Sequence, residues 1–223
     1  MKPIHAVVAW FFEVVTGVVC RIEGAELKQV PKRGPLILAV NHINSLEVPI
    51  LLAHLQPRRM IGLAKIETWD NKFMGWLFDL WESIPIRRGE ADLEAVRRCL
   101  IALKSDDILA VAPEGTRSYD GRLLSGRPGI VLIALRSGAP ILPVAHWGGE
   151  DFSKNIKRLK RTDFHIRVGK PFRLDAQGET VNGKIRQEMV DEIMQQIAIL
   201  MPEQYRGQYA DSTFLPHKYL QFT

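Results

Sequence analysis

A histidine and a carboxylate stand five residues apart at the end of an apolar run. His42 comes soon after residues 36–40, Leu-Ile-Leu-Ala-Val, and Glu47 lies near the start of the next predicted helix. A strand-to-helix turn can fold the carboxylate back onto the imidazole, where it would accept a hydrogen bond from one ring nitrogen. The other nitrogen would then be free to take a proton. The spacing therefore predicts two members of a catalytic triad without its serine.

Taken alone, the same residues also fit a plainer interpretation. His42 would be a structural histidine with satisfied hydrogen bonds, and Glu47 an exposed acid at a helix start. The sequence contains no Gly-x-Ser-x-Gly motif, and the hydroxyl of Ser45 fits a turn better than a nucleophile. The other histidines show no ligand spacing and the His-Glu-x-x-His pair is absent, so we predict no metal site.

A second polar group follows another apolar run. Residues 113–118, Pro-Glu-Gly-Thr-Arg-Ser, come directly after residues 108–112. Gly115 permits a close approach of the backbone, and Thr116 supplies a hydroxyl. Arg117 offers a planar guanidinium group suited to two phosphate oxygens. As a loop alone, this segment suggests an anion site.

A third group, Ile-Pro-Ile-Arg-Arg-Gly, occupies residues 84–89. Arg87 and Arg88 stand where a short strand is expected to end. They could supply a second contact to an anion, although a pair of surface arginines is the default interpretation.

Alternating strand-like and helix-like stretches must position these residues. Apolar runs and period-two alternation predict strands at residues 20–24, 35–40, 59–65, 84–86, 108–112, 141–145 and 164–168. Helical spacing predicts helices at residues 46–55, 73–81, 93–103, 129–136 and 185–200. This alternation is typical of a layered α/β domain, in which reactants usually bind at the carboxyl ends of the strands. No repeat or linker divides the chain. We therefore predict a single α/β domain with a central, mostly parallel or mixed sheet flanked by helices.

Composition agrees with a folded chain. The 223 residues are 46% hydrophobic and 25% charged, which excludes disorder as the main state. The two cysteines, Cys20 and Cys99, are far apart, so neither a disulfide scaffold nor a cysteine-ligated zinc site is supported. A reducing, intracellular setting is the simplest interpretation.

The net charge of +5 favours anionic partners without choosing among them. Five basic residues fall within eight positions: Lys154, Lys157, Arg158, Lys160 and Arg161. A solvated loop or helix face is the default interpretation of such a run. It lacks interleaved aromatic residues and any recognised motif, so we do not expect nucleic-acid binding.

The chain is almost wholly apolar from Ile4 to Cys20. This segment includes Trp10, Phe11 and Phe12, but Glu13 interrupts it, and a crossing helix needs about 20 mainly apolar residues. The bulky residues before Cys20 do not fit a signal-peptide cleavage site. Two interpretations remain, a helix that packs on the core and a helix that lies in the membrane interface with its aromatic residues as anchor.

Taken together, these motifs resemble the four sequence blocks of the glycerolipid acyltransferases. The matching segments, in order, are Asn41-His42 with the carboxylate at 47, residues 84–87, residues 114–117 and residues 139–144. The resemblance covers roughly residues 18–210 and points to the lysophosphatidic acid (1-acylglycerol-3-phosphate) acyltransferase branch. The first block of that family usually reads Asn-His-x-x-x-x-Asp, whereas this chain has Glu47 at the last position.

The resemblance implies an acyltransferase of phospholipid biosynthesis. It would move a fatty acyl group from acyl-CoA or an acyl carrier protein to the hydroxyl of lysophosphatidic acid. His42, held by Glu47, would take the proton from the acceptor hydroxyl, whose oxygen attacks the thioester directly, without an acyl-enzyme. No cofactor is implied beyond the thioester co-substrate.

The resemblance also assigns binding roles. Gly115, Thr116 and Arg117 would hold the phosphate of the acceptor, and Arg87 would be a second contact. By the same resemblance, Glu114 would organise the loop, while Asn41 and Lys65 would be supporting residues.

A lipid acceptor and a lipid product imply a membrane surface as partner. The resemblance therefore favours a membrane-associating helix over residues 1–20, followed by an acyltransferase domain over residues 21–223. The expected location is peripheral or monotopic, on the cytoplasmic face. The basic run at residues 154–161 would attract either anionic lipid or an acidic carrier.

Two other functions stay open. A thioesterase-like hydrolase would use the same base with water in place of the lipid hydroxyl. A non-catalytic lipid-binding protein of the membrane surface is also conceivable, because Glu47 replaces the usual aspartate.

Overall fold

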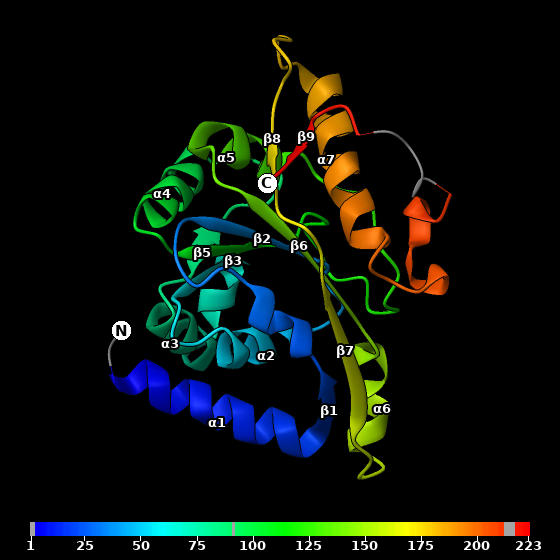
Figure 1. The fold of residues 1–223 in the computed structure, drawn as a ribbon. Coiled ribbons are helices and arrows are strands. Elements are labelled where there is room, and N and C mark those ends of the chain that lie inside the picture. Colours follow the sequence, from blue (N-terminus) through cyan, green and yellow to red (C-terminus); the bar gives the residue numbers. More distant parts are fainter. Residues whose placement is uncertain (1–2, 91, 212–216) are drawn as a thin grey trace.

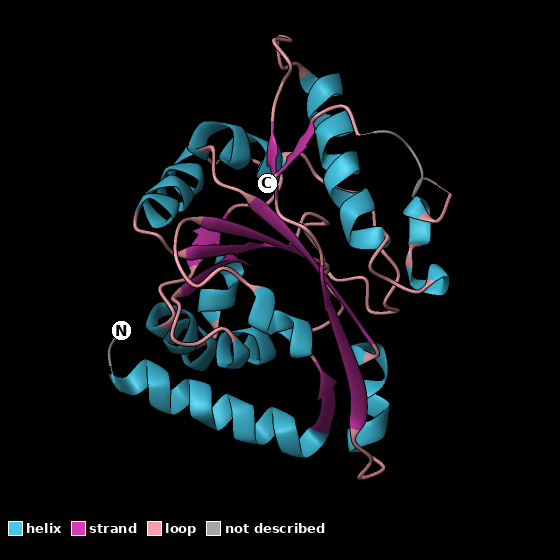
Figure 2. Cartoon of the chain, in the orientation of Figure 1, coloured by secondary structure: helices cyan, strands magenta, loops and turns pink. Residues whose placement is uncertain are grey.

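A computed structural model describes residues 3–90, 92–211 and 217–223. A central sheet is covered by helices on both faces (Figures 1 and 2). One hydrophobic cluster joins the sheet to the α4, α5 and α7 side, and a second joins it to the α2 side. Helix α1 packs along α2 on the outside of that second layer. The predicted single α/β domain with a mostly parallel sheet is confirmed.

The strand order of the sheet is β1-β7-β6-β2-β5-β3-β4. Strands β6, β2, β5, β3 and β4 pair in parallel, β7 runs antiparallel to β6, and β1 runs parallel to β7. A short extension, β8 and β9, continues antiparallel from β6. The strands are β1 (Cys20–Glu23), β2 (Leu36–Val40), β3 (Met60–Lys65), β4 (Ile84–Ile86), β5 (Ile108–Val111), β6 (Ile141–Trp147), β7 (Thr162–Val168), β8 (Phe172–Leu174) and β9 (Leu220–Phe222).

The α-helices at the five positions predicted from periodicity fall close to their expected ranges, whereas no helix was predicted at residues 152–156. They are α1 (Pro3–Val19), α2 (Glu47–His54), α3 (Lys72–Leu80), α4 (Leu93–Lys104), α5 (Gly129–Ser137), α6 (Phe152–Ile156) and α7 (Gly183–Ala198). Side-chain caps fix several starts. Asn71, Asp92 and Asn182 accept hydrogen bonds from the backbone N–H groups three residues ahead. Short 3₁₀ helices occupy Ala25–Gln29, Ile66–Asp70, Gly149–Asp151, Glu203–Tyr205 and Gly207–Tyr209.

Strand β2 is the centre of the core because helices cover both faces of the sheet around it. All five of its residues are buried. Leu36, Leu38 and Val40 face the α2 side, whereas Ile37 and Ala39 face the α4, α5 and α7 side. This alternation is the two-residue period of a strand, and burial on both faces explains why the run is continuously apolar.

The register brings the carboxyl ends of the parallel strands to one edge. Val40 of β2 pairs with Val144 of β6, and Ala39 pairs with Val111 of β5. Farther along the sheet, Lys65 of β3 pairs with Ile86 of β4. The segments that follow β2, β5, β3 and β4 therefore start at the same edge, in that lateral order.

Candidate active site

The imidazole of His42 and the carboxylate of Glu47 are in contact. Strand β2 ends at Val40, and Glu47 is the first residue of α2, so the turn between them returns the carboxylate to the strand end. Nδ1 of His42 donates a hydrogen bond to Oε1 of Glu47. The His42 side chain keeps 17% of its surface exposed, whereas that of Glu47 keeps 3%. The plainer interpretation of Glu47 as an exposed helix-start acid is therefore wrong.

This contact leaves Nε2 of His42 as the nitrogen available to a substrate. Within the described ranges no residue hydrogen-bonds Nε2. Burial is the largest single influence on the pKa of Glu47 and opposes its ionised form. The hydrogen bond with His42 and the charges of His146 and His42 together outweigh burial, so the pKa of Glu47 lies below its ordinary value. An ionised carboxylate accepts only, so the shared proton sits on Nδ1 and the lone pair sits on Nε2.

Glu114 connects the backbone of this pair to the next strand. It follows β5 and is buried to 2% exposure. Its Oε1 accepts a hydrogen bond from the backbone N–H of His42 at 2.7 Å, and its Oε2 accepts one from Leu124 N–H at 2.9 Å. Burial raises the pKa of Glu114 to about 7. The carboxylate of Glu114 therefore fixes the position of His42 through its main chain. It does not contact the ring nitrogens of the imidazole.

Asn41 and His146 hold the other side of the strand end. The side-chain amide of Asn41 donates to the backbone carbonyl of His146 at 2.9 Å and accepts from its N–H at 2.8 Å. Nε2 of His146 donates to the carbonyl of Asn41 at 2.7 Å. His146 is 1% exposed and stacks on Phe164 with ring centroids 5.1 Å apart. Burial lowers the pKa of His146, which favours a neutral ring.

Sequence reasoning did not find His146. Its partner Asn41 is 105 residues away in the chain, and only the pairing of β2 with β6 brings the two together. The one local signal is its place near the carboxyl end of an apolar strand, which is shared by many structural residues.

The loop after β5 lies against the turn that carries His42. Ser118 N–H donates to the carbonyl of His42 at 2.9 Å, and Tyr119 N–H donates to that of Ile43 at 3.2 Å. Gly115 has a left-handed φ of +67°, and a Cβ there would lie 2.7 Å from Cδ of Arg127. The backbone conformation therefore favours glycine, and a Cβ at this position would also require the Arg127 side chain to shift.

Thr116 and Arg117 are exposed at this edge of the sheet. Arg117 directly precedes the residue that hydrogen-bonds to His42, so its backbone lies beside the histidine turn. No ion pair holds its guanidinium group within the part of the chain that the structure describes. The structure thus brings Arg117 to the edge that carries His42 and Glu47, with its charge open to an anion.

Arg87 and Lys65 reach the same edge farther from the histidine. Lys65 ends β3 and Arg87 follows β4, and both side chains are exposed. Two strand positions separate β4 from β5, which is about 10 Å at normal strand spacing. The backbone N–H of Arg87 donates to Asp92 at 3.0 Å, which anchors the residue to the start of α4. The structure therefore places these two cations laterally and not against His42.

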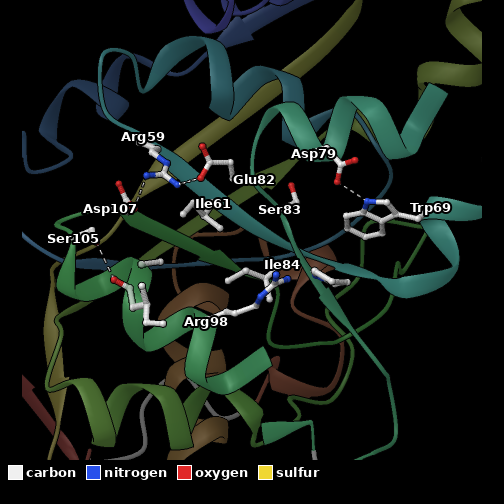
Figure 3. A pocket seen from close by; sticks show the side chains of 13 residues that line it. Arg59, Ile61, Trp69, Asp79, Glu82, Ser83, Ile84, Arg98, Ser105 and Asp107 are labelled. Carbon is white, nitrogen blue, oxygen red and sulfur yellow. Dashed lines mark hydrogen bonds and ion pairs between the residues drawn. The ribbon is translucent and has the colours of Figure 1, made fainter. Parts of the chain in front are cut away.

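A cavity of about 560 Å³ lies away from this edge. Among its lining residues are Arg59, Ser83 and Asp107, which directly precede β3, β4 and β5 (Figure 3). These positions mark the amino ends of parallel strands, whereas His42 follows a carboxyl end. An ion-pair network of Arg59 with Glu82 and Asp107 occupies part of the cavity wall.

The site can do base chemistry with side chains alone. It offers one imidazole nitrogen with a lone pair, a buried carboxylate behind it, and an exposed guanidinium group on the adjacent loop. In the described residues no cluster of three or more His, Cys, Asp or Glu side chains could hold a metal ion. This arrangement suits removal of a proton from a hydroxyl that belongs to an anionic molecule.

Comparisons with known proteins agree with this chemistry. The family described as Acyltransferase matches residues 21–147, more than half of the chain. The 1-acyl-sn-glycerol-3-phosphate acyltransferase of Pseudomonas aeruginosa is 24% identical over 200 residues, covering 88% of this chain and 76% of that protein. A Limnanthes douglasii protein of the same name is 31% identical over 144 residues, covering 63% of this chain and 48% of that protein.

Other matches cover less of the relative or show the fold alone. A chloroplastic 1-acyl-sn-glycerol-3-phosphate acyltransferase of Brassica napus is 28% identical over 116 residues, 51% of this chain. That match spans only 33% of the Brassica protein. The crystal structure of the 1-acyl-sn-glycerophosphate acyltransferase from Thermotoga maritima superposes with a TM-score of 0.63 and 21% identity. It covers 85% of this chain and 76% of the Thermotoga chain, so the two share a fold.

Proposed function

This chain belongs to the acyltransferase family, and from that premise we propose that it transfers a fatty acyl group from a thioester to the hydroxyl of lysophosphatidic acid. The contact between His42 and Glu47 beside the loop of Arg117 is the observation that carries this proposal. Relatives named 1-acyl-sn-glycerol-3-phosphate acyltransferase support the choice of acceptor.

The proposed reaction needs one base and no acyl-enzyme intermediate. Nε2 of His42 takes the proton of the acceptor hydroxyl while the oxygen attacks the thioester carbonyl carbon. The tetrahedral intermediate then collapses, the C–S bond breaks, and the imidazolium returns the proton to the leaving thiolate. The products are an ester and a free thiol. Glu47 holds the ring in one tautomer and stabilises the imidazolium.

Recognition of the phosphate is assigned to the loop after β5. Arg117 offers two parallel N–H donors, and a bidentate contact of this kind suits a phosphate better than a single ammonium group does. Thr116 adds a hydroxyl, and the left-handed turn at Gly115 lets the backbone approach. Holding the acceptor this way would place its free hydroxyl near His42. Arg87 and Lys65 stand farther along the edge, where they could contact the charged part of the donor or of the acceptor.

The donor is proposed to be acyl-CoA or an acylated carrier protein. Both carry the fatty chain as a thioester, and both place negative charge beside it. No further cofactor enters the proposed reaction.

Helix α1 is proposed to lie in the membrane interface. Its exposed face carries Ile4, Val7, Trp10, Phe11, Val14, Val15 and Val18, each between 40% and 66% exposed. Most of these follow spacings of three or four residues, which form one stripe of a helix. The opposite face holds the helix to the domain, because Phe12 packs on Trp81 and Nε2 of His5 donates to the carbonyl of Leu80 at 2.8 Å. One face of the helix therefore packs on the domain, and the exposed apolar face supports the proposed contact with the membrane interface.

These features support a peripheral or monotopic position on the cytoplasmic face. Within the described part of the chain, no helix has the length and apolar character to cross a bilayer. Both cysteines are buried and unpaired, which suits a reducing compartment. We expect Trp10→Ser to reduce sedimentation with phosphatidylcholine vesicles, whereas Leu93→Ser, at another exposed apolar position on α4, should not. If Trp10→Ser and Leu93→Ser both sedimented with the vesicles to the same extent as the parent, the proposed role of α1 would be refuted.

A substrate panel tests the proposed reaction. The purified protein is incubated with acyl-CoA or acylated carrier protein and with lysophosphatidic acid, glycerol 3-phosphate or lysophosphatidylcholine, and the products are identified by mass spectrometry. We expect acylated lysophosphatidic acid and one free thiol for each ester formed. Free fatty acid without acylated lipid would identify a thioesterase, and lipid binding without any thioester turnover would identify a non-catalytic lipid-binding protein. Either result would refute the proposal.

A further inference from the structure

The turn between α6 and β7 presents a leucine that folding does not explain. Leu159 is 97% exposed, although it is a large apolar residue. Its φ of 54° lies in the left-handed region, which is unfavourable for any residue with a side chain other than asparagine or aspartate. Exposure and backbone conformation both cost stability here. A residue with two such costs is a candidate for function.

Hydrogen bonds hold this turn in one shape. The N–H groups of Arg158 and Lys160 both donate to the carbonyl of Asn155 at 2.9 Å. The side-chain amide of Asn155 donates to Thr162 Oγ1 at 3.2 Å. These bonds hold the backbone on both sides of Leu159, and the leucine side chain is exposed at this turn.

Cations flank the leucine in the sequence. Lys157, Arg158 and Lys160 are exposed, and none of them forms an ion pair with a carboxylate of the described residues. The nearest acids along the chain are engaged elsewhere, Asp151 with Lys154 at 3.7 Å and Asp163 with Arg21 at 3.4 Å. We call residues 157–160 the basic turn.

The basic turn is joined to the end of α1. Arg161 donates through Nη2 to the carbonyl of Gly17 at 2.6 Å and through Nε to that of Cys20 at 3.2 Å. Strand pairing places Cys20 opposite Thr162. The basic turn therefore lies at the carboxyl end of the exposed apolar stripe of α1, and the two segments share the lower side of the molecule in Figure 1.

Sheet register relates this side to the catalytic edge. Val40, the last residue of β2, pairs with Val144, and β6 continues to Trp147, which pairs with His165 of β7. The start of β7 and the basic turn before it thus extend beyond the carboxyl ends of the parallel strands. A membrane bound there would lie at the same edge of the sheet as His42, the edge formed by the carboxyl ends of the parallel strands.

We infer that the basic turn is a second membrane contact, which inserts Leu159 among the lipid headgroups and binds anionic lipid through Lys157, Arg158 and Lys160. The inference rests on the proposed docking of α1 at the membrane. It adds that the basic turn makes this docking prefer anionic lipid. An exposed turn that carries one apolar side chain between exposed cations suits a fluid anionic surface, which the side chain can penetrate. A protein partner would need a matching pocket for Leu159. Charge complementarity and continuity with α1 both favour the bilayer.

Vesicle binding tests the basic turn. Sedimentation is measured for the full chain with vesicles of phosphatidylcholine alone and of phosphatidylcholine mixed with phosphatidylglycerol. Replacing the three cations by alanine should weaken binding to the mixed vesicles by about fivefold for each charge, or roughly a hundredfold together. Binding to phosphatidylcholine alone should change little. A charge-matched control replaces three exposed lysines outside the turn, Lys104, Lys170 and Lys184, by alanine.

The tip residue is tested separately by Leu159→Gly. Glycine accepts the left-handed backbone, so the melting temperature should stay near that of the parent and unfolding cannot explain a loss. We expect about tenfold weaker binding to both kinds of vesicle, because the variant loses one inserted apolar side chain. Leu93→Ser, which removes an apolar side chain that is 67% exposed on α4, should bind as the parent does.

The outcomes separate this inference from the proposed function. Parent-like binding of both turn variants would overturn the second contact and leave α1 docking intact, whereas no binding by the parent itself would overturn both contacts. If the cation variant instead kept vesicle binding and lost transfer only from the carrier protein, the partner would be that protein and the lipid inference would be wrong. Transfer between short-chain substrates without vesicles reports on the proposed reaction independently of docking.

Discussion

The carboxylate at position 47 gives the sharpest test of how the histidine is held. We consider Glu47→Gln and Glu47→Asp. The wild-type side chain is 3% exposed, and its Oε1 accepts the hydrogen bond from Nδ1 of His42. Glutamine keeps the length and removes the charge, whereas aspartate keeps the charge and shortens the side chain by about 1.5 Å, one C–C bond.

The expected loss of kcat follows from the hydrogen bond between Glu47 and His42. A hydrogen bond that involves a charged group contributes about 1.5–3 kcal/mol, so its loss should lower kcat of Glu47→Gln by roughly 10–150-fold. If the amide turns its NH₂ group to Nδ1, the ring takes the wrong tautomer, and the loss can approach about 10⁴-fold. In Glu47→Asp the oxygen retreats beyond the usual hydrogen-bond limit of about 3.2 Å unless the start of α2 moves, so we expect a loss of at least about tenfold.

Steady-state transfer of the acyl group to lysophosphatidic acid measures kcat and KM for the parent and both variants. KM for the acceptor should change little, because Glu47 acts through His42 and does not touch the substrate. Glu94→Gln, at an exposed acid on α4, is the matched control and should keep the parent kcat. A parent-like kcat for Glu47→Gln, in a variant with an unchanged melting temperature, would refute the reasoning. A faster Glu47→Asp would mean that the longer side chain is a poor substitute for aspartate.

Three further changes test other parts of the site. Arg117→Ala should raise KM at least about tenfold for phosphate-bearing acceptors and not for neutral ones, whereas Arg122→Ala should change neither; equal effects on both acceptors would argue against phosphate recognition. The pKa of Glu114 is about 7 in the folded protein, against an ordinary value near 4.5. The folded state therefore binds this proton more tightly than the unfolded chain does, so the free energy of unfolding falls as pH rises between these two values. In the parent this fall should amount to about 3 kcal/mol, measured by urea titration at several pH values, and it should be absent in Glu114→Gln. An equally steep fall in the variant would show that another group causes the pH dependence. Asn41→Ala leaves two buried backbone groups of His146 unpaired and should cost roughly 2–4 kcal/mol in the same titration, whereas a cost below about 1 kcal/mol would show that water replaces the amide.

The elements that the sequence predicted well are those whose burial is continuous along the chain. Residues 36–40 form a central strand, and both faces are covered, so every residue must be apolar. The stripe of α7, from Ile185 to Ile197, is buried on one face by the sheet. Such patterns are local and can be read without knowing the partner.

Strands β8 and β9 could not be predicted in the same way. Each has three residues, and their pairing joins Phe172 to Phe222, which are fifty positions apart in the chain. A run this short has no periodicity to read. Its extended conformation is stabilised by the partner strand, which only the folded chain supplies.

The candidate site could be predicted in part, because some of its contacts are local in the chain and others are not. The five-residue spacing of His42 and Glu47 lies within one turn, so local geometry was enough to place them in contact. The clamp from His146 and the position of Arg87 depend on the lateral order of strands, which no local pattern contains. Glu114 was assigned to its loop by resemblance, and its hydrogen bond to the His42 main chain required the pairing of β2 with β5.

One measurement tests the central claim most directly. His42→Ala is compared with the parent for the rate at which acylated lysophosphatidic acid forms from a labelled acyl thioester, with circular dichroism as the check on folding. The account predicts a folded variant whose rate of ester formation falls by at least about a hundredfold, the lower end of what a positioned general base contributes. A folded variant that forms the ester at the parent rate would show that another group removes the hydroxyl proton.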